Sequence, residues 1–143
     1  MSYGLRSYKT SRANTASRED LLILLYEGAI RFLERAIVEL EEKRLSDHKM
    51  SLRRGLAIIS ELQNTLDFEK GEGLAVQLFE LYGFMIHKLT QANVTQDMSH
   101  VRDVISNLNT LLVGWRDAVR QVKQGRGETV EPVEQRRLVG GVA

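Results

Sequence analysis

The side chains that most often carry chemistry are few in this chain and stand far apart. Its three histidines, His48, His87 and His100, have no histidine four residues away, and no Glu-x-x-His pattern occurs. A metal site on helices needs such spacing, because residues three or four apart share one helix face. The chain contains no cysteine, which excludes disulfides and thiolate nucleophiles or ligands. The sequence therefore predicts no metal site.

The glycine pair Gly71 and Gly73 does not make a phosphate-binding loop. It lacks the lysine and the preceding strand that such a loop requires, so it is interpreted as a turn. No segment assembles a nucleophile, a base and an oxyanion donor, and paired acids are typical of solvated helix faces. We therefore expect no catalytic residue and no cofactor, and a protein that is not an enzyme.

The amino-acid composition of the chain narrows the possible classes of function. The chain has 143 residues, enough for one domain, with 43% hydrophobic and 27% charged residues. Its 20 basic and 19 acidic residues give a net charge of +1, and basic residues are interleaved with acids. This balance gives no reason to expect nucleic-acid binding or attraction to a membrane. No apolar run is long enough to span a bilayer, so we expect a cytoplasmic protein without membrane insertion.

The first sixteen residues have no helical periodicity. They contain Arg6, Lys9 and Arg12 with several serines and no acid, a composition that also suits an organellar transit peptide. The segment lacks the apolar face that such a peptide presents, so we interpret residues 1–16 as an N-terminal arm.

Apolar residues recur at three- and four-residue spacing over four segments, which predicts four helices. Ser17 is an expected N-cap with Asp20 at the third helical position, and Glu27 and Arg31 form an i,i+4 pair. The predicted helices run from Ser17 through Leu40, from Ser46 or Asp47 to Leu66, from Leu74 to Leu89, and from Val101 to Val122, with Gly71 and Gly73 ending the second. The single proline, at 132, and the low aromatic content also favour an all-α fold. We predict an antiparallel four-helix bundle over residues 17–123, between the arm and a disordered tail at 124–143.

Two of these helices have more apolar surface than a small bundle buries. Residues 21–26 are apolar on every side, and the third helix spreads its apolar residues over about 160°, against slightly more than 100° for a core-facing stripe. The arm, a second copy of the chain or a partner's helix could cover the excess. Alternatively, these residues are core with a few scattered exposed side chains, which monomers tolerate.

Individual positions carry narrower expectations. A glycine in a helix interior, such as Gly28, lowers helix stability by about 1 kcal/mol relative to alanine. Its presence indicates that another element packs closely there. Tyr26 is interpreted as a core aromatic with its hydroxyl at the edge of the core. Asn93 and Asp97 lie at the end of the third predicted helix and the start of the fourth, and both are expected to cap these helix ends.

Several blocks of the sequence resemble the flagellin export chaperone family FliS, in the family's order and spacing. They are NTAS…LLILLYEGAIRFLERA at residues 14–36, IISELQNTLDFEKG at 58–71, LFELYGFMIHKLTQANVTQD at 78–97 and LLVGWRDAV at 111–119. The chain departs from the family pattern at Arg18, Glu27, Phe84 and Gly114. Phe84 occupies a position at which the family pattern has tyrosine, so no role of this position can depend on a hydroxyl group.

The resemblance implies a non-enzymatic cytoplasmic chaperone. It would bind the disordered C-terminal segment of newly made flagellin in hydrophobic grooves, prevent premature polymerisation and aid delivery to the flagellar type III export gate, with a gate component as partner. The predicted client-binding and arm residues are Tyr8, Leu22, Ile23, Tyr26, Gly28, Phe79, Tyr82, Ile86 and Asn93. Tyr8 matches the family's arm tyrosine. The alternative is a structural helical subunit that self-associates and has no client; weak self-association is also compatible with the chaperone.

Overall fold

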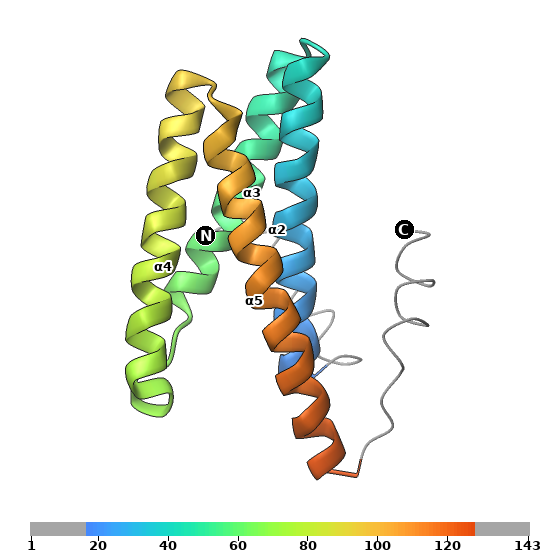
Figure 1. Cartoon of the computed structure of the whole chain (residues 1–143), viewed down its shortest axis with the longest axis vertical. Helices are drawn as coiled ribbons and strands as arrows, with labels where there is room; N and C mark the ends of the chain where they lie inside the picture. Colours follow the sequence, from blue (N-terminus) through green and yellow to red (C-terminus); the bar gives the residue numbers. More distant parts are fainter. Residues whose placement is uncertain (1–16, 128–143) are drawn as a thin grey trace.

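In the computed structural model, which describes residues 17–127, four helices pack as a bundle (Figure 1). They are α2 (Arg18–Glu41), α3 (Leu45–Asn64), α4 (Phe68–Thr95) and α5 (Met98–Gly125), and this part of the chain contains no strand. Neighbouring helices run antiparallel, which confirms the predicted fold class. The predicted arm lies outside the described residues, as does the predicted tail beyond residue 127, and the tail boundary at 124 falls in the last turn of α5.

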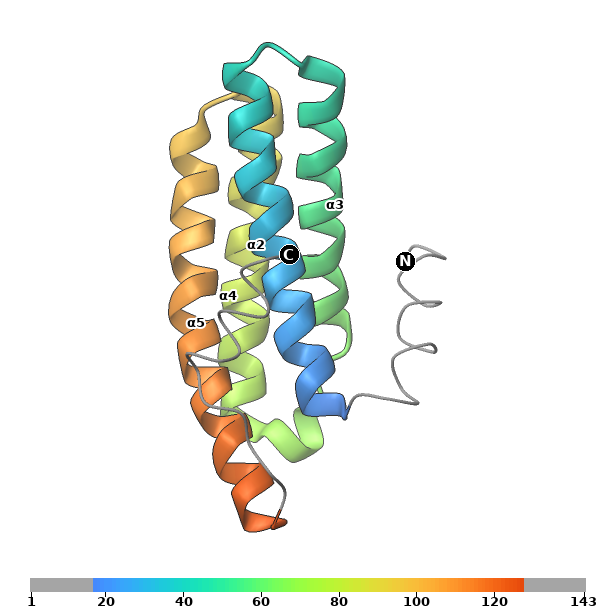
Figure 2. The same cartoon turned by 90° about the vertical axis from the view of Figure 1, so that its right-hand side faces the viewer.

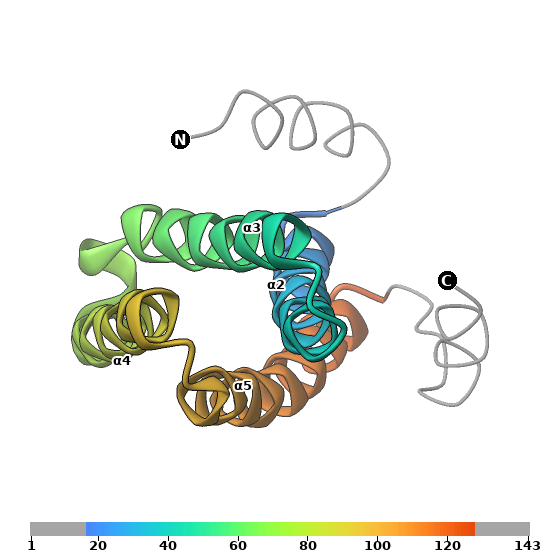
Figure 3. The same cartoon turned by 90° about the horizontal axis from the view of Figure 1, so that it is seen from above.

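The helices occupy the corners of a square, so each contacts two neighbours. Figure 3 shows α2 and α4 at opposite corners, with α3 and α5 between them. Figure 2 shows α2 flanked by α3 on one side and α5 on the other. The core at the centre contains fully buried side chains from all four helices, among them Leu33, Ile59, Met85 and Leu108.

Helix ends follow the local capping chemistry. The Ser17 hydroxyl accepts a hydrogen bond from the Asp20 amide at 3.2 Å, as predicted, and Asp97 accepts one from the Ser99 amide at 3.0 Å. Asn93 lies inside α4 with an exposed side chain that makes no hydrogen bond within residues 17–127, so its predicted capping role is wrong. The residue that ends α4 is Gln96, in the left-handed conformation at φ 60°.

The predicted break at Gly71 and Gly73 is present, but it lies within α4 and does not end α3, so that part of the prediction was wrong. α3 ends earlier, at Asn64, and Asp67 starts α4 by accepting hydrogen bonds from the Glu69 and Lys70 amides, both at 3.1 Å. The two glycines therefore lie within α4, where they flank a kink at Glu72 (φ 47°, ψ −126°). Because an acidic cap was available at residue 67, the chain forms one extra helical turn before the break.

α3 begins slightly before its predicted start. Its first residue is Leu45, and its N-cap, Arg44, makes no side-chain capping hydrogen bond. Ser46 and Asp47 therefore lie in the first turn and do not cap it. The His48 amide donates to the Arg44 carbonyl at 2.9 Å, which closes this first turn without a polar cap.

Candidate functional site

Exposed apolar side chains concentrate on α4. Within residues 17–127, six of the eleven large hydrophobic side chains that remain exposed belong to this helix: Phe68, Leu74, Val76, Phe79, Phe84 and Val94. Phe79 is 46% exposed and Phe84 is 51% exposed, although α4 packs along α3 and α5. We call these six residues, together with the half-buried Ile86, the α4 apolar face.

The α4 apolar face has two flanks. Phe79 and Ile86 are seven residues apart and so lie on nearly the same side of the helix. That side adjoins α3, because the Gln63 side chain donates a hydrogen bond to the Phe79 carbonyl at 3.0 Å. Phe84 lies on the other flank, where Lys88 is 5.1 Å from its ring centroid and donates to Asp103 of α5 at 2.6 Å. A ligand could therefore lie against α4 on the side of α3 or on the side of α5.

The first turn of α4 packs on this surface. Phe68 precedes the kink at Glu72, and its ring lies 5.9 Å from the Phe79 ring at an angle of 59°. Tilted aromatic pairs at this separation attract each other. Both rings nevertheless stay about half exposed, so the turn covers Phe79 only in part.

Four predicted site residues lie inside the bundle. Ile23, Tyr26, Gly28 and Tyr82 are all buried, with Tyr26 at 0% and Tyr82 at 2% exposure. The two tyrosine hydroxyls hydrogen-bond to each other across the centre of the bundle and link the diagonal helices α2 and α4. Burial raises the pKa of both phenols, so they remain protonated. A ligand on the outer surface would not touch these four residues.

The other predicted residues remain accessible to different degrees. Phe79 and Asn93 are exposed and Ile86 is half-buried, all on α4. Leu22 is half-buried on α2, at the opposite corner of the bundle. Tyr8 lies outside the described residues. The structure thus brings Phe79 and Ile86 together and leaves Leu22 on a separate helix.

The apolar start of α2 is largely covered by its neighbours. Ile23 and Leu25 are buried, and Leu21 and Leu22 pack partly against the core. Three ion pairs hold this part of α2 to α5: Glu27 to Arg116 at 2.7 Å, Asp20 to Lys123 at 2.6 Å and Glu19 to Arg126 at 3.1 Å. Residues 21–26 can be apolar on every side because α3 and α5 cover most of their surface. The surplus apolar surface of the bundle is therefore on α4.

Charge pairing lowers the pKa of two acids at this seam. The hydrogen bond from Arg126, supported by Ser17, lowers the pKa of Glu19 to about 2. Burial acts to raise the pKa of Asp20, but the hydrogen bond and charge of Lys123 outweigh it, so the net shift is downward. Both carboxylates are therefore ionised at neutral pH, and their ion pairs link the start of α2 to the end of α5.

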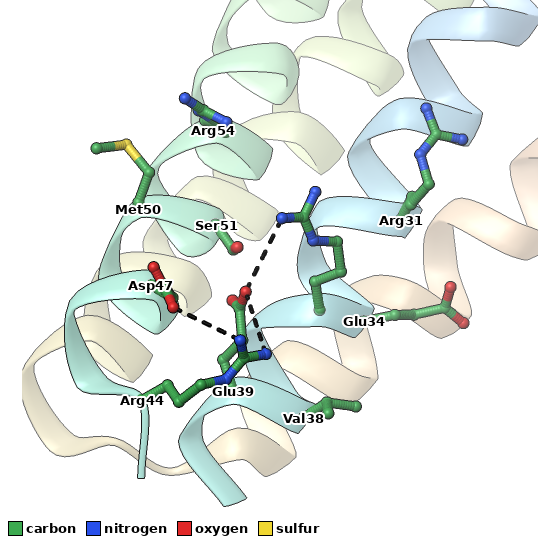
Figure 4. Close-up of a pocket in the computed structure, with 10 residues that line it drawn as sticks. Arg31, Glu34, Val38, Glu39, Arg44, Asp47, Met50, Ser51 and Arg54 are labelled. Atoms are coloured by element: carbon green, nitrogen blue, oxygen red, sulfur yellow. Dashed lines mark ion pairs between the residues drawn. The ribbon is translucent and has the colours of Figure 1, made fainter. Parts of the chain in front are cut away.

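A charged pocket of about 570 Å³ lies between α2 and α3 on the outer side of the bundle (Figure 4). The Glu39 side chain is 5% exposed, and its Oε2 lies 3.9 Å from Arg35 and 4.0 Å from Arg44. Its other oxygen, Oε1, has no hydrogen-bond partner within residues 17–127. Sequence reasoning missed this pocket because its residues look like ordinary solvated charges on each helix.

Other kinds of site find no support in the part of the chain that the structure describes. No helix there is long and apolar enough to cross a membrane. Over the same residues, no cluster of three His, Asp or Glu side chains could hold a metal ion. His48 is fully buried, with its Nδ1 at 2.6 Å from the Ala36 carbonyl, which is the arrangement of a structural histidine.

Comparison with known proteins decides the family. The family described as "Flagellar protein FliS" matches residues 1–122 of this chain. The chain belongs to the FliS family. The resemblance found in the sequence is thus confirmed, and the family is one of chaperones that are not enzymes.

Two named relatives align with most of this FliS family member. The flagellar secretion chaperone FliS of Campylobacter jejuni is 35% identical over 111 residues, which cover 78% of this chain and 87% of that protein. The Salmonella typhimurium protein of the same name is 32% identical over 118 residues, with 79% and 87% covered. A crystal structure titled as a flagellar chaperone from bacteria superposes with a TM-score of 0.69 at 22% identity, over 82% of this chain and 96% of that one. This last likeness supports the fold alone.

Proposed function

We propose that this chain binds the disordered C-terminal segment of newly made flagellin in the bacterial cytoplasm. By holding that segment it prevents premature polymerisation, and the loaded complex engages a component of the flagellar type III export gate. Support comes from the family, whose named relatives are flagellar secretion chaperones, and from the apolar surface left open on the bundle.

The observation that carries the proposal is the α4 apolar face. Its phenylalanines at 79 and 84 are each about half exposed, so covering both rings would contribute roughly 2 kcal/mol. A disordered segment loses conformational entropy when it folds on binding, so it needs several such contacts along its length. The two flanks of α4 offer them to an amphipathic segment that lies along the helix.

The N-terminal arm is the proposed competitor for this surface. Residues 1–16 contain Tyr3, Leu5 and Tyr8, which can cover apolar side chains without belonging to the four-helix core. We expect a chain lacking residues 1–16 to keep its helical content and to bind more of a hydrophobic dye. Equal dye binding by the full and shortened chains would contradict this role of the arm.

The alternative function, a structural subunit that self-associates permanently, predicts a different behaviour in solution. Size-exclusion chromatography over a concentration series, with and without a flagellin C-terminal peptide, separates the two. The chaperone forms a complex of one chain with the peptide at low protein concentration. An oligomer that persists on dilution and ignores the peptide would favour the structural subunit.

A further inference from the structure

The pocket between α2 and α3 contains unmatched charges of both signs. Arg31 on α2 and Arg54 on α3 line it, and neither makes an ion pair within residues 17–127. The predicted partner of Arg31, Glu27, is taken by Arg116 of α5. At the far end, the buried carboxylate of Glu39 has one oxygen without a hydrogen-bond donor among the described residues.

Two of the arginines that line the pocket, Arg35 and Arg54, contact the same aromatic ring. The guanidinium group of Arg35 on α2 lies 5.7 Å from the centroid of the Phe32 ring, and that of Arg54 on α3 lies 5.8 Å from it. Stacking on an aromatic ring leaves the edge of a guanidinium available for carboxylates. Two exposed apolar side chains, Val38 and Met50, complete the lining. The pocket therefore suits a polypeptide that carries acids, small apolar residues and a cation.

We propose that the C-terminal segment of the same chain, residues 128–137, occupies this pocket. Its sequence is ETVEPVEQRR, with glutamates at 128, 131 and 134 followed by arginines at 136 and 137. Along α2 the pocket presents Arg31, Glu34, Arg35 and Glu39 in that order, so its two α2 arginines precede the buried Glu39 carboxylate and Glu34 lies between them. The match to the FliS family ends at residue 122, so family membership assigns no role to this segment.

The spacing of the segment suits an extended strap. Pro132 disfavours helix at the residue before it, and an extended polyproline-type chain has three residues per turn. The glutamates at 128, 131 and 134 would then share one side of the strap. Val130 and Val133, also three apart, would share another side of the strap.

The reach of the segment also fits. α5 ends beside the start of α2, where Arg126 contacts Glu19 at 3.1 Å. Along α2, Arg31 lies about 18 Å and Glu39 about 30 Å from Glu19 at 1.5 Å per residue. An extended chain leaving Gly127 reaches about 22 Å at Glu134 and about 31 Å at Arg137, at 3.1 Å per residue. Arg137 would therefore lie beside the Glu39 oxygen that has no hydrogen-bond partner among the described residues.

A spin label tests this placement in the full chain. Because the chain has no cysteine, Val133→Cys accepts a single nitroxide. We expect paramagnetic broadening of backbone amides around Arg31 and Arg54, and none along the exposed side of α4. Uniform broadening, or broadening centred on α4, would overturn the proposal.

Charge variants give the matched control. Arg31→Gln with Arg54→Gln should weaken docking about fivefold, as expected for the loss of two partly exposed ion pairs. Arg53→Gln with Arg102→Gln removes the same charge from exposed sites outside the pocket and should leave docking unchanged. Equal effects of the two pairs would overturn the specific site in favour of general charge attraction.

Two further arms complete the experiment. Arg54→Glu should weaken docking, and adding Glu134→Arg should restore it; no recovery would contradict the proposed pairing. Mixing isotope-labelled chains with spin-labelled unlabelled chains should give no broadening, because the strap belongs to its own chain. Broadening between chains would show that the segment reaches a second copy and would overturn the proposal. None of these readouts depends on a flagellin peptide.

Discussion

Two glycines on neighbouring helices should respond oppositely to the same substitution. Gly28 on α2 was expected to mark a close helix contact, but a Cβ built there meets only Ile58 Cδ1, at an ordinary 3.5 Å. The close approach is at Gly55 on α3, where a Cβ would lie 2.7 Å from Leu33 Cδ2 and 3.0 Å from Leu33 Cγ. Leu33 is fully buried, so it has little room to move away.

The expected magnitudes follow from these distances. Replacing glycine by alanine inside a helix stabilises it by about 1 kcal/mol. Gly28→Ala should realise that gain. Gly55→Ala should lose about 1–3 kcal/mol to overpacking, so its net effect is a loss of up to about 2 kcal/mol. The free energies of unfolding of the two variants should differ by about 1–3 kcal/mol.

Urea unfolding followed by far-UV circular dichroism measures this difference. Adding Leu33→Val makes room at Gly55, so the double variant Gly55→Ala with Leu33→Val should lose less than the sum of its single losses. The reasoning is refuted if Gly55→Ala is as stable as Gly28→Ala, or if the double variant is strictly additive.

Three further outcomes are expected. Tyr26→Phe and Tyr82→Phe should each cost about 1–3 kcal/mol by stranding the other buried hydroxyl, and the double variant should cost less than their sum in urea unfolding. The pKa of Glu19 falls from 4.5 to about 2 on folding, so its stabilisation is complete above pH 4.5 and disappears as the pH drops towards 2. Glu19→Gln should therefore lower stability by about 1 kcal/mol at pH 7 and by nearly nothing at pH 2, with an equal loss at both pH values arguing against the ion pair. Asp97→Ala should cost about 0.5–2 kcal/mol by thermal unfolding, whereas Asn93→Ala should change stability by less than about 0.5 kcal/mol; the reverse order would contradict the capping geometry.

Features that depend on a few consecutive residues were predictable. The Ser17 cap, the periodic apolar residues of α5 and the all-α class depend on spacing within one helix, which the sequence displays directly. The family resemblance rested on blocks in order along the chain, and the match over residues 1–122 confirms it.

Features that depend on contacts between distant segments were not predictable. The burial of Tyr82 depends on Tyr26, 56 residues away, and the pairing of Glu27 with Arg116 replaces a local pair within α2. The close contact at Gly55 depends on where α3 crosses α2. The two glycines that flank Glu72 indicate a break in the chain, but they do not say which helix contains it.

The most direct test of the proposed function is the affinity for a flagellin C-terminal peptide after changes to the α4 apolar face. Isothermal titration calorimetry would compare the unmodified chain with Phe79→Gln combined with Ile86→Gln, and with Val113→Gln as a control for an exposed apolar residue on α5. If the client lies along α4, the double variant should bind at least tenfold more weakly, since about 1.4 kcal/mol corresponds to tenfold, and Val113→Gln should bind normally. Unchanged binding by a folded double variant would contradict the claim that the client covers the side of α4 that adjoins α3.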